Sequence, residues 1–182
     1  MTFPIIAPQL GDLADPAWAD EITDAVNDHE TRLADLDALL SLVTYKDTIE
    51  TVNNTAVIQN DDELFLSVSA STKYIFDLYV PYNSGTTPDL KVGWTLPASA
   101  TNVWRVDYFD TAAAAQKGQS STVPTTGFVI GGFGADLFAY FTGTISVSTT
   151  AGTMQVVWAQ NTANASNSSI LAGAYLRLFP IP

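Results

Sequence analysis

The residues of this chain that could do chemistry are almost all carboxylates. The sequence has no Cys and a single histidine, His29, so thiol catalysis, Cys-based zinc sites and multi-His metal sites within one chain are excluded. A glycosidase needs two carboxylates that flank the scissile bond. The acidic residues considered for that role are isolated in the sequence: Asp77, Asp89, Asp107, Asp110 and Asp136. We therefore expect no enzymatic activity and no cofactor.

One acidic cluster, Asp61-Asp62-Glu63, stands apart from these isolated residues. Three adjacent carboxylates could hold Ca²⁺ if backbone carbonyls joined them. A solvated turn ahead of a strand that begins at Leu64 is the interpretation we favour, and we predict no metal site here.

Net charge narrows the possible partners. The chain carries 19 acidic and 7 basic residues, a formal charge of −12. Nucleic acid and anionic membrane surfaces both require clustered Lys and Arg, so neither is an expected partner. Eleven of the 19 acidic residues and only two of the seven basic residues fall within positions 1–50. The N-terminal part is therefore much more acidic than residues 51–182, which indicates two parts of different character.

A helix is predicted for the segment 15–46. Asp15 is a suitable N-cap and Pro16 a suitable first helical residue. Apolar positions and one histidine then recur with alternating spacings of four and three, up to residue 43. These positions are Ile22, Val26, His29, Leu33, Leu36, Leu40 and Val43. Such a narrow heptad stripe suits partner helices better than the broad face by which a helix packs on its own domain.

The heptads also indicate an oligomeric state. Arg32-Leu33-Ala34-Asp35-Leu36-Asp37 resembles the motif that specifies trimeric coiled coils, with Arg32 and Asp37 placed to bridge neighbouring helices. His29 would then lie on the three-fold axis as a tolerated polar layer. Because three heptads alone are marginal, we expect the attached domain to trimerise too.

Residues 1–14 are interpreted as an extended arm. Pro4, Pro8 and Gly11 break up the segment, and its apolar side chains have no helical or strand period. The most apolar group is Phe3, Ile5 and Ile6. Docking of this arm on another protein and simple disorder are both open, and we favour docking.

Residues 47–182 are predicted to form a mainly β, antiparallel, jelly-roll-like β-sandwich. Short alternating runs separated by turn signals indicate eight to ten strands, and no helical period appears after Val43. The runs that we expect to be strands are 55–59, 63–69, 74–82, 90–96, 103–109, 122–130, 137–141, 144–148, 153–160 and 170–179. Several of them are apolar on both faces, which favours subunit packing around a three-fold axis.

Arm, coil and β-domain together resemble the small surface proteins of tailed-bacteriophage virions. Three segments look like a β-domain found in phages that infect actinobacteria: Asp61-Asp62-Glu63-Leu64, residues 74–79 and residues 84–94. The resemblance implies a protein assembled in the host cytoplasm and displayed on the virion. Family members serve as tail-fibre tips or as fibres and decorations on heads.

Two hypotheses follow for the function. In the first, a non-enzymatic homotrimer is anchored by its arm to a capsid or tail protein and projects as a head decoration or fibre. In the second, the trimer is a tail-fibre tip that binds host-surface glycans. Segments 112–121 and 161–169, expected to be loops, contain no aromatic residue, which favours the structural role.

Overall fold

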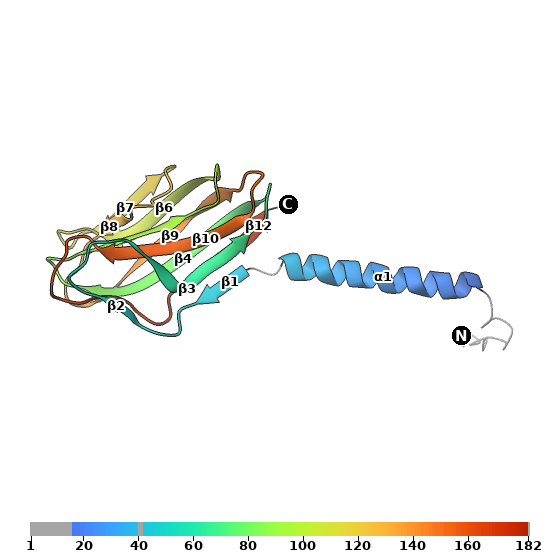
Figure 1. The fold of residues 1–182 in the computed structure, drawn as a ribbon, viewed down its shortest axis with the longest axis horizontal. Coiled ribbons are helices and arrows are strands. Elements are labelled where there is room, and N and C mark those ends of the chain that lie inside the picture. The colour runs from blue at the N-terminus through green and yellow to red at the C-terminus, as the bar shows by residue number, and fades with distance from the viewer. Residues whose placement is uncertain (1–15, 40–41, 182) are drawn as a thin grey trace, which may run out of the picture. The chain divides into compact units, whose positions relative to one another are not determined.

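The chain divides into two compact units. The computed structural model describes residues 16–39 and 42–181, and the helix side chains from residue 18 to 33. Unit one comprises residues 1–40 and unit two comprises residues 41–182. Figure 1 shows a single helix in the described part of the first unit and strands in the second.

The first unit contains one helix, α1, which spans Pro16–Leu39. It begins where the sequence predicts. Every described side chain between residues 18 and 33 is exposed, including the apolar ones. Within α1, the described residues of the apolar stripe are therefore exposed.

The predicted end of the helix is wrong. Val43 lies in strand β1 (Leu42–Tyr45), opposite Arg177 of β12, and so it cannot extend the heptad pattern. The segment 42–45 contains two adjacent β-branched residues and ends in Tyr45, a composition that favours a strand once a neighbouring strand offers backbone partners. The boundary therefore falls between residues 39 and 42 rather than at residue 46.

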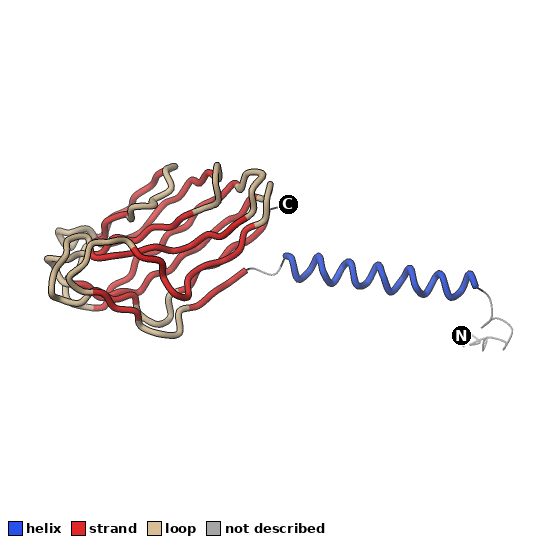
Figure 2. Tube along the Cα trace, viewed as in Figure 1, coloured by secondary structure: helices blue, strands red, loops and turns tan. Residues whose placement is uncertain are grey.

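The second unit is an antiparallel two-sheet structure, which confirms the mainly β, sandwich-like prediction (Figure 2). The eight-stranded sheet follows the order β1-β12-β4-β9-β6-β7, with β11 paired to β4 and β2. Its strands after β1 are β2 (Glu50–Val52), β4 (Lys73–Ser84), β6 (Thr101–Phe109), β7 (Ala115–Ser120), β9 (Asp136–Ser146), β11 (Ser168–Ile170) and β12 (Tyr175–Ile181). The four-stranded sheet has the order β3-β10-β5-β8. Its strands are β3 (Gln59–Val68), β5 (Leu90–Thr95), β8 (Phe128–Ile130) and β10 (Gly152–Gln160).

The strand order follows a regular scheme. We count the eight consecutive strands β3 to β10 from first to eighth. The four-stranded sheet, β3-β10-β5-β8, then has the order first, eighth, third, sixth. The stretch β4-β9-β6-β7 of the larger sheet has the order second, seventh, fourth, fifth. Strands β1, β2, β11 and β12 extend the larger sheet beyond β4. Chain segments distant in sequence therefore lie side by side throughout the unit.

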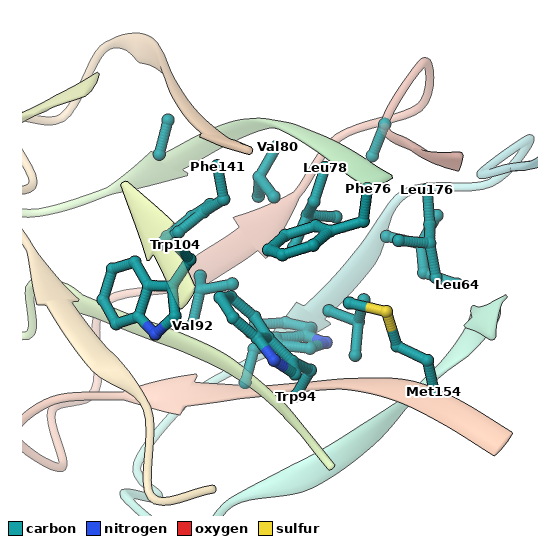
Figure 3. Close-up of a cluster of buried hydrophobic side chains, with 14 of the residues drawn as sticks. Leu64, Phe76, Leu78, Val80, Val92, Trp94, Trp104, Phe141, Met154 and Leu176 are labelled. Atoms are coloured by element: carbon teal, nitrogen blue, oxygen red, sulfur yellow. The ribbon is translucent and has the colours of Figure 1, made fainter. Parts of the chain in front are cut away.

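The core lies between the two sheets and is strongly aromatic (Figure 3). The Trp94 ring packs edge-on against Phe76, Trp104 and Phe141, with ring centroids 5.1 to 5.6 Å apart. Met154 lies beside this group and is fully buried. Burial of these large rings is the main apolar contribution that holds the sheets together.

Several predicted strand boundaries differ from the structure. Residues 55–58 lie outside the strands, 122–127 form a loop, and 137–148 is largely one continuous strand, β9, rather than two. Strand β7 was expected to be a loop because its sequence is polar. It forms because β6 offers it a free edge, and this tertiary pairing outweighs weak strand propensity.

The acidic cluster at Asp61 is not a solvated turn. It lies within β3, where the pairing register with β10 shifts. Asp61 is fully buried: its Oδ1 accepts the backbone N–H groups of Glu63 and Leu64 at 3.0 and 2.9 Å, and Lys46 Nζ lies 3.0 Å from its carboxylate. The Lys46 ammonium also donates to Glu50 at 2.8 Å.

The buried ammonium of Lys46 thus ties β2 and β3 to the end of β1. Burial works against its charge, but the hydrogen bonds to Glu50 and Asp61 outweigh burial and raise the pKa of Lys46. The two carboxylates therefore stabilise the charged form of Lys46. A metal ion would have to displace Lys46 from Asp61.

Replacing Lys46 with Met should destabilise the β-unit by about 3–5 kcal/mol, because it leaves the Asp61 carboxylate buried without its cation. The measurement is urea denaturation of the full chain at neutral pH. Lys117→Met is the matched control, since its side chain is 81% exposed and its ion pair with Asp107 spans 3.7 Å. That control should change stability by less than about 1 kcal/mol. Equal effects of the two substitutions would contradict the structural role of Lys46.

Candidate functional site

The two sheets differ in what covers the face turned away from the core. On the four-stranded sheet, the loop 121–127 lies directly on β5: a Cβ added at Gly93 would fall 1.8 Å from the carbonyl oxygen of Pro124. On the eight-stranded sheet, the alternate residues that point away from the core include many half-exposed aromatic and charged side chains. We call this surface the outer face. The residues that define it here are Val43, Tyr45, Ile75, Asp77, Tyr79, Val103, Arg105, Asp107, Phe109, Lys117, Gln119, Phe138, Tyr140, Thr142, Thr144, Tyr175, Arg177 and Phe179.

An aromatic row crosses the outer face from β1 to β6. Tyr45 lies 6.2 Å from Tyr175, which lies 5.7 Å from Tyr79, measured between ring centroids. Tyr79 is followed by Phe138 at 6.0 Å, and Phe138 by Phe109 at 6.5 Å. Tyr45 and Phe138 are 58% and 47% exposed. Five neighbouring strands therefore present a continuous line of rings to solvent.

A polar network lies beside the aromatic row. Arg177 donates to Asp77 Oδ2 and the Tyr140 hydroxyl donates to Asp77 Oδ1, both at 2.7 Å. The Arg177 guanidinium also stacks over Phe179, 4.6 Å from the ring centroid. Burial works against the charge of Asp77, yet the hydrogen bonds from Arg177 and Tyr140 outweigh burial and lower the pKa of this carboxyl. Burial, together with that carboxylate, raises the pKa of Tyr140 to about 12.

The outer face is hollowed along β6. A hollow of about 580 Å³ is lined by consecutive residues of three strands: 103–105, 119–121 and 142–144. A second hollow, of about 250 Å³, is lined by residues 107–109 and 115–117 and by Phe138. The hollows follow one another along β6, because Arg105 lines the first and Asp107 the second. We call the two together the β6 groove.

The charges in the β6 groove are not balanced. Asp107 lies 3.7 Å from Lys117, its cross-strand neighbour on β7. Arg105 instead has Thr142 and Gln119 as cross-strand neighbours, both neutral, and makes no ion pair with any described residue. One guanidinium is therefore available in the middle of the groove.

The structure describes only some of the residues of the predicted coiled-coil interface. Ile22, Val26, His29 and Leu33 are all exposed along α1. Arg32 lies 3.9 Å from Asp28 of the same helix, and both side chains are about 70% exposed. Leu36 and Asp37 belong to α1, but their side chains lie outside the described set, as does Leu40 altogether. The predicted anchoring residues Phe3, Ile5 and Ile6 also lie outside the described residues.

The isolated carboxylates have separate structural partners. Asp89 Oδ1 accepts the Gly132 backbone N–H at 3.0 Å, and Asp136 accepts from the side chain of Asn83 at 2.7 Å. Asp110 accepts two backbone N–H groups of the following loop, both at 2.9 Å. The remaining two are Asp77, bound to Arg177, and Asp107, beside Lys117. Among the side chains that the structure describes, no group of three or more acidic or histidine residues is arranged to hold a metal ion.

The outer face was missed at the sequence level. Several strands are predicted from the sequence to be apolar on both faces, without separation of their aromatic residues, whereas the structure separates these residues by their alternation along each strand. Trp94, Trp104 and Phe141 point into the core, while Tyr79 and Phe138 point outward. The available signal was the alternation within β4 and β9, which places Asp77 and Tyr79 on one face and Leu78 on the other.

Comparisons with known proteins give only distant likenesses. No family model and no curated protein matches the chain. Among solved structures, the infectious bursal disease virus Gx strain is similar at 11% identity, TM-score 0.25, over 77% of this chain and 39% of that one. The VP2 subviral particle of the same virus gives 9% identity, TM-score 0.22 and coverages of 79% and 43%. The chain thus spans about two-fifths of the chains it matches, and likeness at this level does not establish a function.

No helix within the described residues is long and apolar enough to cross a membrane. The single helix that they contain, α1, carries acidic residues throughout its length.

The Asp77 network gives a pH-dependent contribution to stability. Since the pKa of Asp77 is lower in the folded state, the contribution is present above the usual value of 3.8 and is lost as pH falls through the folded-state pKa. Asp77→Asn should cost about 1–2 kcal/mol at neutral pH. The difference from the wild type should shrink as pH falls below 3.8.

Urea denaturation across the acid range measures this difference. Asp62→Asn is the control, because Asp62 is an exposed carboxylate of the other sheet. A gap between wild type and Asp77→Asn that stayed constant down to acid pH would contradict the assignment.

Proposed function

We propose that this protein is a non-enzymatic structural protein of a tailed-phage virion, a homotrimeric surface projection anchored by its N-terminal arm. The observation that carries the proposal is the exposure of apolar side chains along one stripe of α1. Val26 is 50% and Leu33 60% exposed on this helix. An apolar stripe of this kind is stable in water only when partner helices cover it.

Three chains in parallel register are the partners that fit best. The sequence from Arg32 to Asp37 carries the trimer-type motif, and the guanidinium of Arg32 is exposed enough to leave Asp28 for a carboxylate of a neighbouring helix. His29, between Val26 and Leu33 on the same stripe, would then form a polar layer on the axis. A parallel trimer would also display three β-units on one side of the assembly.

The β-unit supports a structural role in two ways. Its strand order, first-eighth-third-sixth and second-seventh-fourth-fifth, supports the jelly-roll assignment. Its isolated carboxylates are engaged in hydrogen bonds or ion pairs, so none is poised as a general acid. The role on the virion is that of a capsid (head) decoration or fibre, bound through the arm to a capsid or tail protein.

A second candidate function is a tail-fibre tip adhesin that binds host-surface glycans. The observation that favours it is the β6 groove, with the aromatic row beside it. Sugars are bound by aromatic rings that stack on their C–H faces and by polar side chains that bind their hydroxyls. Both kinds of group are exposed on the outer face, and three copies would add avidity.

The homotrimer is tested by sedimentation equilibrium of the full chain at micromolar concentration. We expect the mass of three chains for the wild type. The double substitution Val26→Asp and Leu33→Asp should abolish the trimer, because six carboxylates would be forced into the coil. Glu30→Gln with Asp24→Asn, off the stripe, is the control and should leave the mass unchanged. A wild-type monomer, or a trimer that survives the double substitution, would refute the coil.

Anchoring is tested by deletion of residues 1–14. We expect the truncated protein to keep the wild-type mass, because the heptads remain, and to be lost from purified particles after complementation of a deletion phage. Particles are assayed by immunoblotting and by immunogold labelling, which also distinguishes head from tail. Full incorporation of the truncated protein would place the anchor elsewhere in the chain.

A further inference from the structure

We infer that the β6 groove is a binding site for an acidic oligosaccharide, with Arg105 binding its carboxylate or phosphate and the Phe109–Phe138 pair packing against a sugar ring. This inference rests on the second candidate function above and assigns it a site and a ligand class. The argument depends on the shape of the groove, its mixture of side chains and the charge that it leaves unpaired.

The shape suits a chain-like ligand. The groove follows β6 from Val103 to Phe109, a length of about 20 Å at the usual rise of a strand. It lies over β9, β6 and β7, where Val103 and Phe138 are 61% and 47% exposed, so an oligosaccharide could enter along its length. On the smaller sheet, the loop 121–127 lies over β5.

The side chains of the groove divide into polar and aromatic parts. Around the larger hollow, Arg105, Gln119 and Thr144 supply guanidinium, amide and hydroxyl groups, which can pair with sugar hydroxyls. Around the smaller hollow, the rings of Phe109 and Phe138 lie 6.5 Å apart in an edge-to-face arrangement. An apolar ligand alone would leave the guanidinium unpaired, and an inorganic anion alone would leave the rings unused.

Charge decides between an acidic and a neutral sugar. Arg177 and Lys117 each have an aspartate directly opposite on the neighbouring strand, whereas Arg105 has only neutral neighbours there. In a chain with a formal charge of −12, an arginine left unpaired in a hollow is a specific feature rather than a general excess of positive charge. A guanidinium binds carboxylate or phosphate in two parallel hydrogen bonds, so the ligand is expected to carry such a group.

A second copy of the chain is the other possible occupant of this face. Interfaces between permanently associated subunits are apolar at their centre and depleted of charge. The outer face instead carries the Arg177–Asp77 pair near its middle and Arg105 within the groove. A charged, hollowed surface of this kind fits a hydrophilic ligand better than a subunit interface.

The experiment is isothermal titration of the full chain with defined oligosaccharides bearing uronate, sialate or glycerol phosphate, and with their neutral counterparts, at up to about 1 mM. We expect at least one acidic oligosaccharide to bind and its neutral counterpart to bind at least about tenfold more weakly. Arg105→Gln and Phe138→Ala should each weaken binding by about tenfold or more. Lys73→Gln is the matched control, because Lys73 lies on the same sheet, in β4, outside the groove, and it should bind as the wild type does.

Three results would overturn the inference: no acidic oligosaccharide binds, neutral counterparts bind equally well, or Arg105→Gln binds unchanged.

Sedimentation of the same variants tests the alternative occupant, a second copy of the chain. If Arg105→Gln or Phe138→Ala reduced the oligomer mass, the face would belong to a subunit interface and the inference would be wrong. Unfolding midpoints equal to the wild type show that each variant is folded. Absence of glycan binding by the wild-type chain, with its oligomer and virion incorporation intact, would refute the site and leave the structural role standing.

Discussion

The long antiparallel pairing of β4 with β9 is the constraint on which the rest of the β-unit depends. It runs without a break from Lys73 opposite Ser146 to Asn83 opposite Asp136. Because side chains alternate between the two faces of a strand, this single register decides which residues enter the core and which reach the outer face. If the pairing register slipped by one residue, Tyr79 would turn toward the core in place of Leu78, and the core side chains would be exposed.

The same register explains how much of the fold could be predicted from the sequence. Alternation and turn signals indicated a mainly β, antiparallel sandwich, because those signals are local. Strand β7 and the burial of Asp61 depend on partners outside their own segments, namely the preceding strand β6 and Lys46. The end of the helix was missed for a related reason: Val43 satisfies the heptad spacing, and only the presence of β12 makes a strand the better alternative.

The candidate site was less predictable than the fold, for a physical reason. Arg105, Phe109 and Phe138 lie on two strands separated by the β7 and β8 segments, and nothing in their local sequence distinguishes them from core or solvent positions. Their meaning comes from cross-strand neighbours: the same residue type, arginine, is neutralised at position 177 and left unpaired at position 105. Searching the predicted loops for aromatic residues could not find a site built on a sheet face.

The two units have different ways of leaving apolar surface exposed, and this difference separates their roles. On α1 the exposed apolar side chains recur at heptad spacing along one stripe, which calls for an identical partner in register. On the outer face the exposed rings form one row beside charged pairs and border a groove, a mixture less suited to a permanent partner than a uniform apolar surface. The proposed function therefore assigns self-association to the helix and leaves the outer face for a ligand that is both polar and partly apolar. A trimer built by the helix would carry three such grooves, and weak binding at each would add to strong attachment of the whole.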